Sequence, residues 1–383
     1  MPKQHHLPDL ADCWRLARTE GVGPIAWRRL LARYHTPAAA LAALPRLARA
    51  GGRDAPLAIP SPDEAHRELD RLAKLQARLL VLDQPDYPPL LAMLEDAPPV
   101  IAVQGDIALL ATRSIAVVGG RNASANGQRM AETLGADLAR HLTVVSGLAR
   151  GIDAAAHHGA LATGRTVAVV AGGLDMPYPP EHAALQARIA ETGAVVAEAP
   201  LGTAPQARHF PRRNRIVAGL ALGVVVVEAA QRSGSLITAR IAQEAGREVF
   251  AVPGSPTDPR SRGANDLLRQ GAILTETAAD VLDNLPAHPI YSDLPATGVP
   301  VAPGLAEPAA EQPDDTVDFP RVLSQVLDLL GPSPTAVDDV VRRCQFSPAA
   351  VMVALLELEL AGRLEMLPGS RVALLSDGAR LIE

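Results

Sequence analysis

Short apolar runs alternate with helix-period patterns through the middle of the chain. The runs have no polar residue at alternate positions, which is typical of strands covered on both faces. They are found at 79–82, 100–103, 115–118, 143–145, 167–170, 195–197, 224–227, 249–252 and 273–274. The alternation predicts an α/β domain over residues 77–285, with an extended Rossmann-like, doubly wound and mostly parallel sheet.

The segment before this domain reads as short helices at 10–18, 25–34, 37–49 and 62–76. The first two are joined by the compact link Gly21-Val22-Gly23-Pro24, where the proline suits a helix start and the glycines permit a tight reversal. Residues 1–76 are therefore expected to form a helical domain similar to sterile-alpha-motif or helix-hairpin-helix modules. The glycine link fits either backbone contact with DNA or a purely structural turn.

The chain after the α/β domain divides into a proline-rich linker, 286–319, and a small module, 320–383. Helical patterns at 322–330, 336–343 and 348–361 precede two strands at 364–367 and 372–375, which predicts a winged helix-turn-helix. Its third helix contains Glu357 and Glu359 but no Lys or Arg. Reading of a DNA groove normally uses cations or amides, so this helix is expected to have a protein-contact or regulatory role.

Composition limits where a polyanion could bind. The 383 residues have a formal net charge of −6, and lysine occurs only at positions 3 and 74, so any nucleic-acid contact requires a local patch of arginine. Aromatic residues make up 3% of the chain, which makes each one more informative. Cys13 and Cys344 match no metal-binding or redox spacing, no apolar run approaches ~20 residues, and no signal peptide is visible, so a reduced, cytoplasmic protein is expected.

Candidate binding residues lie where the predicted strands end. Four strands lead into small-residue loops, an arrangement that exposes backbone amides to anions at helix N-termini. These loops are Gly119-Gly120-Arg121-Asn122, Ser146-Gly147, Gly172-Gly173 and Ser233-Gly234-Ser235.

The segment 209–215, HFPRRNR, adds three guanidinium groups and the ring of Phe210, which suit a phosphodiester backbone and its bases. A helix cannot point all three of these arginines the same way. At least one is expected to pair with an acid such as Glu228.

Three enzymatic alternatives fit less well. The first loop lacks the GxGxxG fingerprint, and no acidic residue ends the second strand, which disfavours a dinucleotide enzyme. Ser146, Asp153 and His157 lie close in sequence, but VVSGL is not the GxSxG elbow of hydrolases, and a structural role for Asp153 and His157 is favoured. A nucleotide-processing enzyme related to lysine-decarboxylase-like phosphoribohydrolases stays open as the rival, although RSGSLITARIAQE lacks the PGGxGTxxE of that family.

The motifs together resemble the bacterial DNA-processing protein A family (DprA, also called Smf). The matching segments include SIAVVGGRNAS, VVSGLARGIDAAAHHGAL, TVAVVAGGLDMPYPPEHAAL, FPRRNRIVAGL, VVVVEAAQRSGSLITARIAQEAGREVFAVPGS and GANDLLRQGA, in order over roughly residues 84–282. The resemblance implies single-stranded-DNA binding, loading of the RecA recombinase during transformation and recombination, and a homodimer. It implies no catalysis, cofactor or metal.

Carried over by motif, the resemblance assigns DNA contact to one set of residues: Arg121, Ser146, Gly147, Phe210, Arg212, Arg213, Asn214, Arg215, Ser233, Gly234 and Ser235. Gly120 replaces a hydroxyl residue usual in the family, and the loop from Tyr178 to His182 departs from the family pattern and is assigned no contact. The segment 263–274 is expected to place Leu268 and Leu274 at a dimer interface near a sheet edge.

Overall fold

The computed structural model describes residues 9–286 and 319–375, which form two compact units. Residues 68–286 make up unit 2. Residues 9–67 and 319–375 together make up unit 1, although they lie at opposite ends of the sequence. The linker predicted at 286–319 falls outside the described residues except at its two ends.

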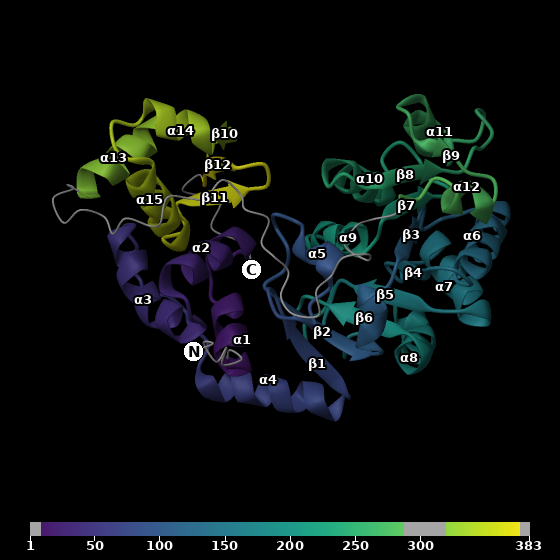
Figure 1. Ribbon diagram of the computed structural model, residues 1–383, viewed down its shortest axis with the longest axis horizontal. Coiled ribbons are helices and arrows are strands. Elements are labelled where there is room, and N and C mark those ends of the chain that lie inside the picture. Colours follow the sequence, from purple (N-terminus) through teal and green to yellow (C-terminus); the bar gives the residue numbers. More distant parts are fainter. Residues whose placement is uncertain (1–8, 287–318, 376–383) are drawn as a thin grey trace, which may run out of the picture. The chain divides into compact units, whose positions relative to one another are not determined.

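Unit 2 is built on a nine-stranded sheet with the order β1-β2-β6-β5-β4-β3-β7-β8-β9 (Figure 1). Strand β2 pairs antiparallel with both β1 and β6, and every other pairing is parallel. The bounds are β1 (Ala77–Val81), β2 (Val100–Gly105), β3 (Ser114–Val118), β4 (Thr143–Ser146), β5 (Thr166–Val170), β6 (Ala194–Ala197), β7 (Gly223–Val226), β8 (Glu248–Ala251) and β9 (Ile273–Leu274). The predicted doubly wound, mostly parallel sheet is confirmed.

The strand order reverses at β3, whose neighbours are β4 on one side and β7 on the other. Ligands of doubly wound folds bind outside the carboxyl ends of the strands at such a switch point. The connecting helices are α5 (Pro89–Ala92), η1 (Ile107–Ala111), α6 (Ala125–Leu138), α7 (Ile152–Thr163), η2 (Pro180–His182), α8 (Ala183–Thr192), α9 (His209–Gly219), α10 (Gly234–Glu244), α11 (Arg262–Arg269) and α12 (Ala278–Leu282).

The core beside β3 is aliphatic. Ile115, Val117 and Val225 from the strands pack with Leu134 of α6 and Ile152 of α7. Burial of this kind stabilises by roughly 25 cal/mol for each Å² of apolar surface. It holds the loops at the ends of β3, β4 and β7 on a rigid base.

The far edge of the sheet is formed by the short strand β9, as predicted. The neighbouring leucines of α11 face differently, because Leu267 is buried whereas Leu268 is half-buried. Leu274 of β9 has 51% of its surface exposed. Among the described residues, no helix combines the length and apolar character needed to cross a membrane.

Unit 1 joins the N-terminal helices to the winged-helix module. The bounds are α1 (Leu10–Arg18), α2 (Pro24–Tyr34), α3 (Pro37–Ala50), α4 (Pro62–Lys74), α13 (Phe319–Leu329), β10 (Thr335–Ala336), α14 (Val337–Arg343), α15 (Pro348–Leu360), β11 (Leu364–Leu367) and β12 (Arg371–Leu374). The unit contains all of these except the second half of α4, from Glu68 onward, which belongs to unit 2. Ile25 of α2 packs against the core of the winged module, and α15 lies against α2 and α3.

Helix α15 is buried on every side from Ala354 to Leu360. Its backbone lies so close to the N-terminal helices that a Cβ added to Gly51 would collide with the carbonyl of Glu357. A Cβ on Gly21, in the link between α1 and α2, would lie 3.4 Å from the carbonyl oxygen of Glu359. The glycine link thus packs against α15, which favours the structural interpretation of that turn.

Two buried carboxyl groups lie on α15. Glu357 and Glu359 are 6% and 8% exposed. Burial raises the pKa of each to about 7, and the positive charges of Arg33 and Arg46 near Glu357, and of Arg29 near Glu359, oppose that rise. The protein contact expected for the third helix is made within this chain, with its own N-terminal helices.

Candidate nucleic-acid interface

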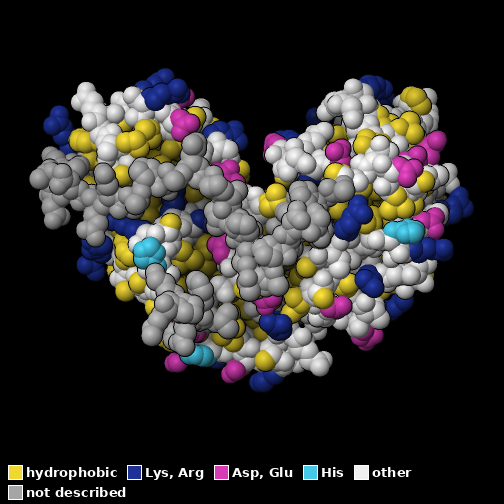
Figure 2. All heavy atoms as spheres, in the orientation of Figure 1, with side chains coloured by type: hydrophobic (Ala, Val, Ile, Leu, Met, Phe, Trp, Pro, Cys, Tyr) yellow, Lys and Arg dark blue, Asp and Glu magenta, His cyan; other side chains and the backbone are white. Residues whose placement is uncertain are grey.

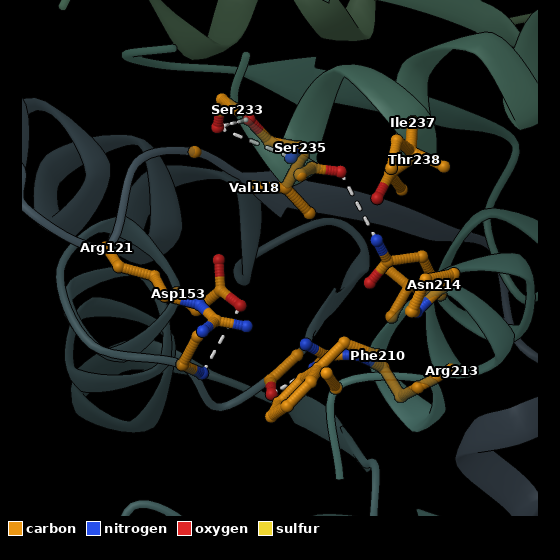
Figure 3. Close-up of a pocket in the computed structure, with 17 residues that line it drawn as sticks. Val118, Arg121, Asp153, Phe210, Arg213, Asn214, Ser233, Ser235, Ile237 and Thr238 are labelled. Atoms are coloured by element: carbon orange, nitrogen blue, oxygen red, sulfur yellow. Dashed lines mark hydrogen bonds between the residues drawn. The ribbon is translucent and has the colours of Figure 1, made fainter. Parts of the chain in front are cut away.

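A cavity of about 510 Å³ opens at the switch point of the sheet (Figure 3). It is lined by the loops after β3, β4 and β7 and by one face of α9 and the first turns of α10. The lining residues are Val118, Gly119, Arg121, Gly147, Ala149, Asp153, Ala207, Phe210, Pro211, Arg213, Asn214, Val217, Ser233, Gly234, Ser235, Ile237 and Thr238.

Arg121 brings an exposed positive charge to this cavity. It follows β3, and none of the ion pairs among the described residues includes it. Its guanidinium carbon lies over the ring of Phe210, 4.5 Å from the ring centroid. The face of an aromatic ring attracts a cation and holds it in place without neutralising its charge.

The N-terminus of α10 faces the same cavity. Ser233 caps this helix, because its Oγ accepts a hydrogen bond from the backbone N–H of Ser235 at 3.4 Å. Asn214 of α9 donates through Nδ2 to the carbonyl of Gly234 at 3.2 Å, which ties the two helices together at this point. The first-turn amides and the helix dipole favour an anion here.

Arg213 forms the floor of the cavity. Its guanidinium donates to the carbonyl of Val169 at 3.0 Å and to that of Gly147. A Cβ on Gly147 would occupy the place of this guanidinium, so glycine is required there. Burial lowers the pKa of Arg213, and the nearby Asp153 acts in the opposite direction.

Asp153 places a buried carboxyl group near Arg213. Its carboxylate accepts a hydrogen bond from the backbone N–H of Ala149 at 3.3 Å. Burial raises its pKa, whereas Arg213 and the backbone hydrogen bonds favour the charged form. The positive charges of both Arg213 and Arg121 act on the Asp153 carboxyl group, and Arg121 is the exposed one of the two arginines that line the cavity.

The polar side chains behind the cavity, those of Ser146, His157 and Thr166, form hydrogen bonds within the fold. The Ser146 hydroxyl donates to the carbonyl of Val117 at 2.6 Å. The hydroxyl of Thr166 donates to the carbonyl of Val144, so it must accept from Nδ1 of His157, 2.7 Å away. Burial lowers the pKa of His157 to about 3. These bonds favour the structural role expected for His157 and leave Ser146 without a base.

The cavity brings together most residues of the predicted site: Arg121, Gly147, Phe210, Arg213, Asn214, Ser233, Gly234 and Ser235. Three others lie elsewhere. Ser146 is fully buried in β4, and Arg212 is exposed on α9 outside the lining. Arg215 turns away from the cavity, where its Nη2 lies 2.5 Å from the carboxylate of Glu198.

Glu228, the acid expected to pair with one of these arginines, has other partners in the structure. Glu228 accepts hydrogen bonds from Ser124 and lies 3.3 Å from Arg260. The structural partners of Arg215 are Glu198 and the more distant Asp96, at 3.8 Å. The suggestion of Glu228 was wrong because the carboxylate of Glu228 is already occupied by Ser124 and Arg260.

Sequence reasoning missed two residues at this site. Asp153 lines the cavity as well as supporting it. Tyr178, in the loop assigned no contact, has its ring centroid 5.7 Å from that of Phe210. The scarcity of aromatic residues in the chain was the signal that could have drawn attention to Tyr178.

The face of the molecule in Figure 2 shows no continuous basic surface among the described residues. Arginine side chains are scattered there among acidic ones, as the negative net charge leads one to expect. On this face, electrostatic attraction to a polyanion would have to be local.

The fold and the cavity define a class: a Rossmann-like protein whose switch point offers arginine, helix-terminal amides and an aromatic ring, without a dinucleotide fingerprint. Comparison with known proteins gives the family. The chain belongs to the DNA recombination-mediator protein A family, whose model matches residues 78–286. The DprA-like N-terminal HHH domain matches residues 8–70, and the DprA winged helix domain matches residues 306–370.

Individual relatives agree with this assignment. Protein Smf of Escherichia coli is 43% identical over 299 residues, which cover 77% of each chain. The X-ray structure of DNA processing protein A from Streptococcus pneumoniae aligns with a TM-score of 0.63 and 34% identity, over 74% of this chain and all of that one. A structure of the Helicobacter pylori protein, described by its single-stranded DNA binding mode, aligns with a TM-score of 0.50 and 29% identity, over 55% of this chain and 95% of that one.

Proposed function

We propose that this protein binds single-stranded DNA at the switch-point cavity. Arg121 is the observation that carries the proposal, because it is an exposed guanidinium that lies over an aromatic ring and takes part in none of the ion pairs among the described residues. Arg121 and the first-turn amides of α10 contact phosphates, and the ring of Phe210 lies where a base can approach. Arg212, exposed on α9, adds charge outside the cavity.

Two buried arginines support this site without touching DNA. Arg213 fixes the Gly147 loop through its bonds to backbone carbonyls. Arg215 anchors α9 through Glu198. The single strand therefore meets loops that are already in position, which lowers the entropic cost of binding.

The family supports a proposal for the cellular role. We propose that the protein loads the RecA recombinase on single-stranded DNA in the cytoplasm, during natural transformation and recombination. The family description as a recombination mediator and the single-stranded-DNA-binding relative support this role. The domain boundaries proposed for the chain are 1–76, 77–285, 286–319 and 320–383.

The sheet edge at β9 is the proposed homodimer surface. Leu274 exposes half of its surface on an edge strand, and Leu268 on the preceding helix α11 is half-buried. Two protomers joined there would let one strand engage both cavities, with a gain from effective concentration. Leu274→Arg should yield a folded monomer in light scattering; a wild-type protein that is monomeric at tens of micromolar would refute the dimer.

Isothermal titration separates DNA binding from the rival, a nucleotide-processing enzyme. Oligo-dT should bind with an affinity that falls steeply with salt, because phosphate contacts release counterions. Free nucleotides should bind weakly and remain unchanged after incubation. Tight binding and turnover of a free nucleotide, without affinity for oligo-dT, would favour the enzyme.

A further inference from the structure

Three flat side chains are in contact at the rim of the cavity: Arg121 from the loop after β3, Phe210 from the first turn of α9, and Tyr178 from the segment before η2. The guanidinium of Arg121 lies over the ring of Phe210, and the ring of Tyr178 packs against Phe210 in a tilted arrangement, with an interplanar angle of 57°. Tyr178 comes from the segment between β5 and η2, which contributes no residue to the lining of the cavity itself. Tyr178 therefore extends the aromatic surface beyond the residues that line the cavity.

Tyr178 is exposed although it contacts another ring. Its exposed fraction is 46%, and that of Met176 in the same loop is 37%. Only five large hydrophobic side chains are exposed among the described residues, and these two belong to one loop next to the cavity. An apolar surface exposed at a site rim is commonly where a partner binds.

The loop that holds Tyr178 is fastened at several points. The imidazole of His182 bonds through Nδ1 to the carbonyl of Leu148, which lies between Gly147 and Ala149 of the cavity. The backbone N–H of Gly202 donates to Asp175 at 2.7 Å, and Arg71 pairs with the same carboxylate at 2.8 Å. An aromatic face fixed in this way loses little conformational freedom when a base stacks on it.

The geometry points to Tyr178 as a base-stacking residue for single-stranded DNA, which we infer as an extension of the proposed function. One face of Phe210 is already covered by Arg121, at 4.5 Å. Tyr178 supplies a further aromatic surface to the next base along the strand, while Arg121 holds the phosphate. Because every base has a π-face, this contact is independent of sequence.

The test uses full-length protein and an oligo-dT that spans one site. Loss of one base stack should weaken binding roughly 5- to 150-fold for Tyr178→Ala. Tyr178→Phe keeps the ring and should restore most of the affinity. Met176→Ala is the matched control, since it removes an exposed apolar side chain from the same loop without removing a ring.

A scan with abasic positions in the oligonucleotide identifies the contacted base. In wild-type protein, one abasic position should reproduce the loss caused by Tyr178→Ala, and that position should have no further effect in the variant. Equal losses for Met176→Ala and Tyr178→Ala, or additive losses in the scan, would overturn the stacking role. If Tyr178→Ala binds normally while Arg121→Glu does not, stacking fails and the proposed function stands; if neither change affects binding, the proposed function fails as well.

Discussion

Arg29 and Arg33 of unit 1 and Arg121 at the cavity of unit 2 lie in opposite surroundings. On α2, Arg29 and Arg33 lie near the buried carboxyl groups of α15, inside a packed interface. At the cavity, Arg121 is exposed and contacts an aromatic ring. A guanidinium with a partner inside the chain cannot be removed without leaving that partner uncompensated, whereas an exposed guanidinium without such a partner is available to a phosphate.

The same distinction separates neighbours on one helix. In α9, Arg212 is exposed, Arg213 donates to buried carbonyls, and Arg215 pairs with Glu198. Counting arginines in the segment HFPRRNR would assign all of them to DNA. The partners of each side chain, and not the number of charges, define the candidate interface.

The largest expected effect is on folding. Arg215→Glu places a negative charge against the half-buried Glu198 and Asp96, and breaking a fully buried pair costs about 3–5 kcal/mol, so a loss of about 2–3 kcal/mol is expected here. Denaturant unfolding should show this loss, whereas Arg212→Glu, with the same charge change on the exposed side of α9, should leave stability within about 0.5 kcal/mol. Equal stability of both variants would remove the distinction.

The next effect is on binding. Arg121→Glu should weaken binding of oligo-dT on the order of a hundredfold, since charge-assisted contacts contribute about 1.5–3 kcal/mol each. The slope of log affinity against log salt should flatten by about 0.7 for each phosphate that the variant no longer neutralises. Arg188→Glu on the exposed surface of α8 carries the same charge change outside the cavity. If Arg121→Glu and Arg188→Glu weaken oligo-dT binding equally, the attraction depends on the overall charge of the protein and not on the cavity.

A third effect tests the packing of unit 1. Gly51→Ala introduces a Cβ that collides with the backbone of Glu357, and overpacking of this kind costs about 1–3 kcal/mol. The φ of Gly51 is −70°, so alanine strains nothing else. Gly23→Ala is the control, because nothing lies within 4 Å of its Cβ. A melting temperature of Gly51→Ala equal to that of the control would show that α15 does not pack there.

The smallest effect depends on pH. Glu357 and Glu359 have a folded pKa of about 7, above their ordinary value, so the folded state binds more protons. The stability they contribute is fully present below about pH 4.5 and is lost as the pH rises through 7. The wild type should melt a few degrees below the double variant Glu357→Gln, Glu359→Gln at pH 8 and close to it at pH 5.5. If the difference in melting temperature between the two proteins is the same at pH 5.5 and pH 8, the buried state of these carboxyl groups is contradicted.

Sequence patterns predicted the sheet well, because each strand is a continuous apolar run whose burial does not depend on distant detail. The cavity was also predictable, since small residues and Arg121 follow strands that end at one edge. The neighbours of individual side chains were not predictable. Only the three-dimensional fold brings Tyr178 against Phe210, Arg215 against Glu198, and Glu357 against the N-terminal helices.

Unit 1 is assembled from two segments with the whole of unit 2 inserted between them. On the ribosome, α3 emerges about 300 residues before α15, a delay of roughly 15–60 s at ordinary rates of synthesis. The inserted sheet can complete its folding in that interval, while the surface of α2 and α3 that will cover α15 is still open to water and to chaperones. Unit 1, which needs both ends of the described chain, is thus expected to fold last. A chain whose synthesis stops before α15 would contain the cavity of unit 2 but an incomplete unit 1.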